Sequence, residues 1–115
     1  MLPASHRLRR ADDFRRALRS GARAGGKLLV VHWTAAADPN DGEQPPRVGF
    51  VVSKQVGPAV VRSRVKRRLR HQVRARLGRL NPGSVYVVRA NPAAATASSE
   101  ELGDALDACL DKASR

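Results

Sequence analysis

Apolar positions along the 115-residue chain recur with two periods, and each period predicts a different kind of element. Three short segments rich in valine and other apolar residues are expected to be strands, at 27–35, 47–54 and 84–90. The first of these is apolar on both parities, which is typical of a strand covered on at least part of both faces. The turn-rich loop 37–46 separates the first two strands, so we expect them to pair as an antiparallel hairpin.

Two further segments repeat their apolar residues with the helical period. Residues 10–21 place Phe14 and Leu18 on one face, and Gly21 is a typical helix stop. A second helix is expected to have Pro58 in its first turn and to end near residues 77–78. The stripe that would dock this helix onto the sheet consists of Val61, Val65, Leu69, Val73 and Leu77.

A third helix is expected over residues 98–113, with Ser98 or Ser99 as its cap and two glutamates in its first turn. Its apolar stripe consists of Leu102, Ala105, Leu106, Cys109 and Leu110. The single cysteine excludes an internal disulfide framework, fits a small buried residue, and indicates a reducing cytoplasm. Length and the absence of a repeat or linker predict one domain that spans residues 1–115.

The distribution of charge along the chain gives information about a binding partner. The formal net charge is +12, and basic residues gather in two segments: eight against two acids in 1–27, and nine against none in 62–79. Such a footprint predicts a polyanionic partner. Nucleic acid is favoured over a membrane surface, because a membrane-surface helix would need bulky apolar residues opposite its basic face. No apolar run approaches the ~20 residues of a spanning helix, and the N-terminal segment lacks the apolar region of a secretory signal.

The basic segment has two sides when it is placed on a helical wheel. Opposite the apolar stripe lie Ser63, Lys66, Arg67, Arg70 and Arg74, flanked by Arg62, Arg64 and His71. A merely solvated face would mix its signs and form ion pairs between neighbouring turns, whereas like charges here repel one another. We therefore interpret this face as a phosphate-contact surface. The preference for arginine suits phosphate forks, although genome composition explains it equally well.

Catalytic motifs are not evident in the chain. Residues 21–27 match the G-x-x-x-x-G-K spacing of a phosphate-binding loop, but Leu28 stands where Ser or Thr is needed, and a helix precedes and a strand follows. His6, His32 and His71 show no metal-ligand spacing. No Ser/His/Asp arrangement can be proposed, so the chain is not expected to carry out chemistry by itself.

The stretch SKQVGPAVVRSRVKRRLR (53–70) closely resembles the signature of the protein subunit of bacterial ribonuclease P, K-x-x-G-x-A-V-x-R-N-R-x-K-R-x-x-R. The matching residues are Lys54, Gly57, Ala59, Val60, Arg62, Arg64, Lys66, Arg67 and Arg70. LPASHRLRRADDFRRALRSG (2–21) resembles the first helix of that family, and the later elements follow in the family's order. One position departs, because Ser63 stands where the family usually has Asn.

The resemblance implies an α/β (α+β) two-layer sandwich like domain 2 of ribosomal protein S5. Such a fold has a mixed, mostly antiparallel sheet, three helices and a left-handed βαβ crossover, which is rare among proteins. The resemblance also implies a subunit of a tRNA-processing endonuclease, a hydrolase that works as a cytoplasmic ribonucleoprotein. In that family the RNA subunit, with Mg²⁺, removes the 5′ leader of precursor tRNA.

By position, the resemblance assigns contacts with the catalytic RNA to Lys54, Arg62, Ser63, Arg64, Lys66, Arg67, Arg70 and Arg74. It assigns the leader-binding cleft to Arg10, Phe14, Leu18, Val30 and His32. No catalytic or metal-binding residue is expected on this chain, and neither a membrane nor an obligate protein partner is evident. On residue type alone, a buried structural role for Phe14 is the commoner one.

Two other functions stay open from the residues. The first is a non-enzymatic RNA-binding protein of the ribosomal type, since the expected fold is shared. The second is a helix that binds double-stranded DNA, which is weaker because no helix-turn-helix spacing precedes the basic segment.

Overall fold

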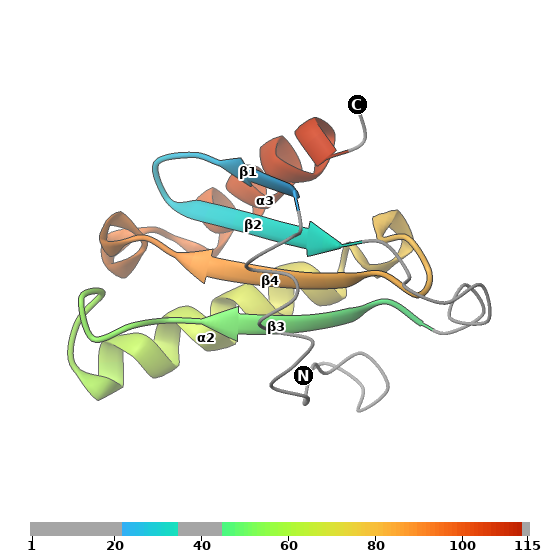
Figure 1. The fold of residues 1–115 in the computed structure, drawn as a ribbon. Helices are drawn as coiled ribbons and strands as arrows, with labels where there is room; N and C mark the ends of the chain where they lie inside the picture. Colours follow the sequence, from blue (N-terminus) through green and yellow to red (C-terminus); the bar gives the residue numbers. More distant parts are fainter. Residues whose placement is uncertain (1–21, 35–44, 114–115) are drawn as a thin grey trace.

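A computed structural model describes residues 22–34 and 45–113 of the chain (Figure 1). Its elements are β1 (Ala22–Gly25), β2 (Leu29–Thr34), β3 (Arg47–Val51), α2 (Ala59–Arg74), the short 3₁₀ helix η3 (Leu77–Arg79), β4 (Val85–Ala90), the 3₁₀ helix η4 (Pro92–Thr96) and α3 (Ser99–Ala113). The helix expected over 10–21, with Arg10, Phe14 and Leu18, lies outside the described residues. Within the described part the α-helices are therefore two, where the whole chain was expected to have three.

The four strands form one mixed sheet in the order β1-β2-β4-β3. β2 is antiparallel to both β1 and β4, whereas β3 is parallel to β4. The three expected strands are confirmed, but the expected hairpin of the strands at 27–35 and 47–54 is wrong, because β4 lies between β2 and β3. Five of the six residues of β4 are buried, and burial of this extent favours an interior position in the sheet over an edge.

The strand β1 (Ala22–Gly25) was not expected from the sequence, where residues 21–27 match only the spacing of a phosphate-binding loop. Ala22 pairs with Trp33, and Gly25 pairs with Val30. A tight turn joins β1 to β2, and in it the Gly26 N–H donates to the Leu29 carbonyl at 2.9 Å. Small residues give no periodic signal, so pairing with the apolar β2 decides the conformation of this segment.

Both helices pack on one face of the sheet, and the other face carries no helix from the described part (Figure 1). β3 and β4 run in the same direction, and α2 crosses between them on the far side of the sheet as Figure 1 is viewed. A connection that runs from β3 up to β4 through a helix on that side is left-handed. This is the hand that the resemblance implied and that general rules disfavour.

The main core lies between the helices and the sheet and follows the expected stripes, while Val85 and Val87 of β4 are buried on the other face. Val65, Leu69 and Val73 are the buried residues of α2. The buried stripe of α3 consists of Leu102, Leu106, Cys109 and Leu110, with Ala105 half-buried beside it. Val61 and Leu77 are only half-buried, because they lie at or beyond the ends of α2. Within the described ranges, no helix is long and apolar enough to cross a membrane.

The two helix starts are formed differently. Pro58 is the N-cap of α2, one position before the first helical turn where it was expected. At α3 the Glu101 N–H donates to Ser98 Oγ at 3.0 Å, and the Ser98 N–H donates to Glu101 Oε1 at 3.0 Å. This reciprocal pair is a capping box, and it identifies Ser98 rather than Ser99 as the cap. These hydrogen bonds lower the pKa of Glu101.

Candidate RNA interface

The outer face of α2 is a strip of cations that we call the α2 cation strip: Lys66, Arg67, Arg70 and Arg74. Arg67, Arg70 and Arg74 are exposed and Lys66 is half-buried, while the buried stripe of the helix faces the sheet. Within residues 22–34 and 45–113, none of the four makes a hydrogen bond or ion pair. Ser63 is exposed on the same side of the helix. The strip therefore has like charge, solvent access and unused donors.

Arg62 and Arg64, expected to contact RNA, also serve the fold. Arg62 Nε donates to the Gly57 carbonyl at 3.1 Å, which ties the side chain to the start of α2. Arg64 Nη2 donates to the Ala95 carbonyl of η4 at 3.2 Å. A guanidinium has five N–H donors, so each side chain keeps others for a ligand. These hydrogen bonds hold the side chains of Arg62 and Arg64 in place, whereas no described residue holds the side chains of the α2 cation strip.

Lys54 lies next to the start of α2 because of a turn that glycine permits. The Gly57 N–H donates to the Lys54 carbonyl at 3.2 Å, and Lys54 itself is exposed. Gly57 has a φ of 153°, and a Cβ there would lie 3.1 Å from Val61 Cγ1. A side chain at this position would therefore both strain the turn and crowd the first turn of α2.

Other arginines of the basic segment are engaged with α3 and the connector before it. Arg68 Nη1 donates to the Ala97 carbonyl at 2.7 Å. Arg76 forms a fork with Asp107, with Nε to Oδ1 at 2.6 Å and Nη2 to Oδ2 at 3.0 Å. Arg79 bonds to Asp107 at 2.9 Å and to Asp111 at 2.5 Å. The sequence could not separate these docking arginines from the strip, because their partners on α3 and in the connector before it lie about 30 residues away.

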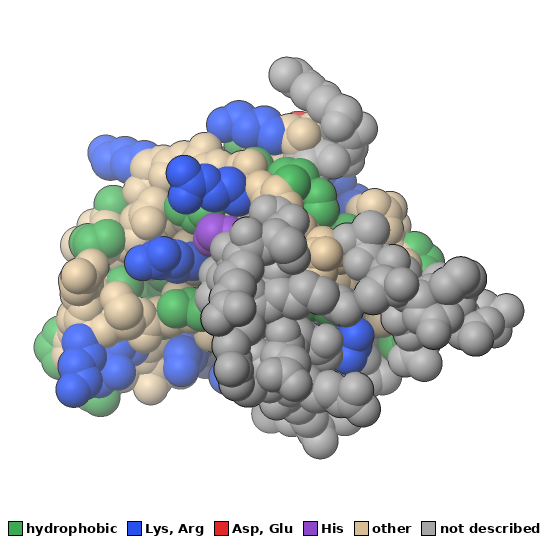
Figure 2. Space-filling model, in the orientation of Figure 1, with side chains coloured by type: hydrophobic (Ala, Val, Ile, Leu, Met, Phe, Trp, Pro, Cys, Tyr) green, Lys and Arg blue, Asp and Glu red, His purple; other side chains and the backbone are tan. Residues whose placement is uncertain are grey.

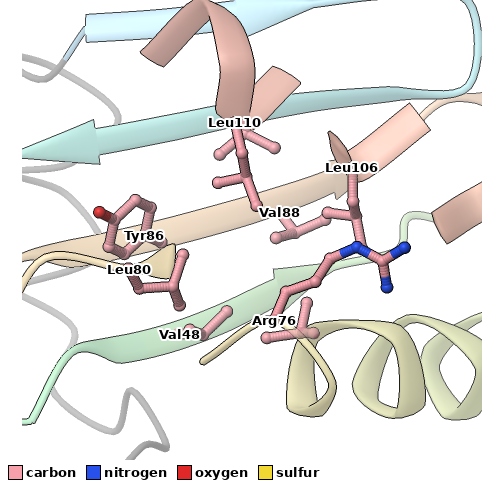
Figure 3. Close-up of a pocket in the computed structure, with 9 residues that line it drawn as sticks. Val48, Arg76, Leu80, Tyr86, Val88, Leu106 and Leu110 are labelled. Atoms are coloured by element: carbon pink, nitrogen blue, oxygen red, sulfur yellow. The ribbon is translucent and has the colours of Figure 1, made fainter. Parts of the chain in front are cut away.

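The fork is held at the edge of an apolar pocket between the helices and the sheet. Figure 3 shows Arg76 with its guanidinium end beside Leu106 and its stem among the apolar side chains that line the pocket. The hydrogen bond between Arg76 and Asp107 lowers the pKa of Asp107 and raises that of Arg76. This pair therefore keeps both charges at neutral pH and fixes the C-terminal end of α2 against α3.

The sheet face opposite α2 and α3 carries the two expected cleft residues that the structure describes. Val30 and His32 share this face of β2, and Val30 is half-buried. His32 is only 6% exposed, and its Nε2 is buried without a hydrogen-bond partner among the described residues. Burial lowers the pKa of His32, and the nearby charges of Arg23 and Arg89 lower it further. His32 is therefore a neutral, buried residue of this sheet face at pH 7.

Arg23 and Arg89 were not among the expected site residues. Arg23 of β1 pairs with His32, and Arg89 of β4 pairs with Val30, so both lie on this same face. Figure 2 shows blue side chains beside the purple histidine on this face. The two-residue period of β4, in which Arg89 shares its parity with Val85 and Val87, could have indicated Arg89. Arg23 gave no such signal, since its strand was not expected.

Together these features define a class of protein. The described part is an α+β domain in which a mixed sheet carries two helices on one face. The α2 cation strip has no partner among the described residues, and α2 itself contains no carboxylate. This is the arrangement of a nucleic-acid-binding protein.

Comparison with known proteins identifies the family. The family model for ribonuclease P matches residues 2–114, and the chain belongs to this family, the protein component of the enzyme that processes the 5′ ends of tRNA. The ribonuclease P protein component of Streptomyces griseus is 57% identical over 116 residues, covering 97% of this chain and 94% of the relative. The one from Mycobacterium avium is 46% identical over 110 residues, covering 96% and 92%.

Solved structures show the same fold. The ribonuclease P protein of Staphylococcus aureus superposes with a TM-score of 0.81 at 23% identity, covering 94% of each chain. The protein from Thermotoga maritima gives 0.77 at 24% identity, covering 92% of this chain and 96% of the other. The fold is thus retained where most side chains differ. Membership of this family makes the ribonuclease P RNA a partner of the chain.

Proposed function

We propose that the chain binds the ribonuclease P RNA through the outer side of α2 and holds the 5′ leader of precursor tRNA on the sheet face opposite α2 and α3. The α2 cation strip carries this proposal. Its four like charges have no partner among the described residues, and a polyanion would offset the repulsion between them. Lys54, Arg62, Ser63 and Arg64 extend the same surface toward the start of the helix.

The part of the protein in catalysis is electrostatic. Among the described residues, no cluster of three His, Cys, Asp or Glu side chains could hold a metal ion. We therefore assign the Mg²⁺ ions to the complex of RNA and substrate, where phosphates supply the oxygen ligands that Mg²⁺ prefers. The cations of α2 offset repulsion between the phosphates of two RNAs, and this lets Mg²⁺ bind productively at a lower concentration.

The sheet face opposite α2 and α3 discriminates between substrate and product. Precursor tRNA has a leader and mature tRNA has none, so any contact with the leader favours the precursor. Val30 and His32 form part of the floor of this cleft, and we assign Arg10, Phe14 and Leu18, which lie outside the described residues, to the same cleft. Since its RNA partners are made in the cytoplasm, we also place the protein there.

Reconstitution tests this function. Purified protein added to the cognate ribonuclease P RNA is expected to raise the rate of precursor-tRNA cleavage at low Mg²⁺, and to raise it less as Mg²⁺ increases. A variant with Lys66, Arg67, Arg70 and Arg74 all changed to Ala is expected to lose this stimulation while staying folded. A wild-type protein that binds RNA but never stimulates cleavage, at any Mg²⁺ concentration, would favour an RNA-binding protein of the ribosomal type.

A further inference from the structure

Two exposed arginines lie on the sheet face opposite α2 and α3, one on each side of β2. Arg23 pairs with His32 across β1 and β2, while Arg89 pairs with Val30 in β2 and with Val51 in β3. β1 and β4 are both neighbours of β2, so they lie about 10 Å apart, and the two arginines are offset by two residues along the strands. A chain of nucleotides that crosses β2 obliquely would meet both.

This face has no negative charge within the described part of the protein. None of the strands β1 to β4 contains Asp or Glu. Every carboxylate in residues 22–34 and 45–113 belongs to α3, which packs on the opposite face. Neither Arg23 nor Arg89 has a hydrogen bond or ion pair with a described residue. Both guanidinium groups are therefore available to an anion.

The two arginines differ in solvent exposure from the residues that lie between them. Arg23 and Arg89 are exposed, whereas His32 is buried and its Nε2 is covered. Gly25 stands opposite Val30 and has no side chain, which leaves the half-buried Val30 open from the β1 side. This face therefore has two exposed cations, Arg23 and Arg89, with the small apolar surface of Val30 between them. Such a combination suits the binding of single-stranded nucleic acid without sequence preference.

We infer that Arg23 and Arg89, rather than His32, make the polar contacts to the leader on this face, each binding a different phosphate of the single strand. The inference rests on the proposed function and adds two residues to it. Guanidinium groups bind phosphate oxygens through paired N–H donors and read no base, so the contacts would hold leaders of any sequence.

The test uses the reconstituted holoenzyme with Arg23→Ala, Arg89→Ala and the double variant. The matched control is Lys27→Ala, which removes the same charge from an exposed position in the turn between β1 and β2. Binding is measured for precursor tRNA and for the same tRNA without its leader, each over a range of salt concentrations. Arg23→Lys and Arg89→Lys retain the charge and check that any loss is not a loss of folding.

Each alanine variant is expected to weaken precursor binding roughly three- to fivefold, the upper range for an exposed ion pair, and to leave mature tRNA unaffected. The slope of log affinity against log salt should fall by about 0.7 for each lost contact with a single strand. Equal losses for both tRNAs, or losses no larger than that of Lys27→Ala, would overturn the assignment. Lack of stimulation by the wild-type protein would instead count against the proposed function.

Discussion

Ser63 is the single residue at which the basic signature of the family is interrupted. It is exposed on the outer side of α2, one residue from Arg62 and Arg64, and its hydroxyl is shorter than the amide that the family usually places there. Ser offers one hydrogen-bonding group, whereas Asn offers a donor end and an acceptor end. Its surroundings on the helix are otherwise those of the family signature.

We expect Ser63→Asn to tighten binding to the ribonuclease P RNA, because the longer amide reaches further and bonds at both ends. The change in the free energy of unfolding should stay within about 0.5 kcal/mol, as is usual at exposed positions. Filter binding and urea denaturation measure the two quantities. Unchanged or weaker RNA affinity in a folded variant would show that the RNA partner of this chain does not use the amide.

His32 makes a different residue-scale prediction, on pH. Burial and the charges of Arg23 and Arg89 hold its pKa in the folded protein below the usual 6.5, so the unfolded chain binds more protons near that pH. Stability should therefore be lost as pH falls through about 6.5 and gained as pH rises above it. The carboxylates Asp107 and Glu101 have lowered pKa values and affect stability only at more acidic pH.

Thermal denaturation between about pH 5.5 and pH 7.5 checks this prediction, because histidine is the side chain that titrates in that range. The midpoint of the wild-type protein should fall toward the acid end. His32→Gln should flatten the dependence, while His71→Gln, a change at an exposed histidine of α2, should leave it as steep. The prediction fails if the His71 variant is the flatter of the two.

At the scale of elements, α2 and α3 are held together by polar groups as well as by their apolar stripes. Gln72 Nε2 donates to Ser99 Oγ at 2.8 Å, and the Arg76 fork on Asp107 lies four residues further along the chain, just past the end of α2. These contacts set where the outer side of α2 points, so the proposed binding of RNA by α2 depends on them.

We expect Asp107→Asn to lower the free energy of unfolding by about 1 kcal/mol, a value reduced from that of a buried charged hydrogen bond because the Asp107 side chain is 42% exposed. Asp111→Asn is the matched control: it removes the same charge from a pair with Arg79 in which Asp111 is 66% exposed, and should cost less. Urea denaturation compares the two. Equal effects would mean that the Arg76 fork contributes nothing beyond net charge.

Much of this fold could be predicted from periodicity, and what could not depends on partners distant in sequence. Three strands, both described helices and the apolar stripes follow from the spacing of Val, Leu and Ala. The strand β1 and the central place of β4 do not, because Ala22–Gly25 carries no pattern of its own and sheet order depends on burial of both faces of β4. The local preference for a hairpin was misleading for the same reason.

The candidate site divides in the same way. The α2 cation strip follows from a helical wheel, since the stripe of Val65, Leu69 and Val73 fixes which side faces outward. The docking arginines Arg68, Arg76 and Arg79 look identical to the strip in sequence, and only their acceptors on α3 and in the connector before it distinguish them. Arg23 lies beside His32 only because β1 pairs with β2, so the local sequence pattern could not have predicted its position.

At the scale of the whole molecule, charge is sorted by surface. The described carboxylates gather on α3, the cations of α2 without a described partner form one strip, and Arg23 and Arg89 lie on the sheet face opposite the helices. This separation gives the proposed function two cationic surfaces for RNA, with the acidic helix on neither. The two surfaces match a complex with two RNAs, one catalytic and one substrate.

The most direct test of this account is the salt dependence of binding to the ribonuclease P RNA for Arg70→Ala and Arg79→Ala. Both variants remove one exposed arginine from the same basic segment, but Arg70 has no partner in the described part and Arg79 pairs with Asp107 and Asp111. Arg70→Ala is predicted to weaken binding and reduce the slope of log affinity against log salt by about one. Arg79→Ala is predicted to leave the slope unchanged. A reduced slope for Arg79→Ala, or an unchanged one for Arg70→Ala, would contradict the account.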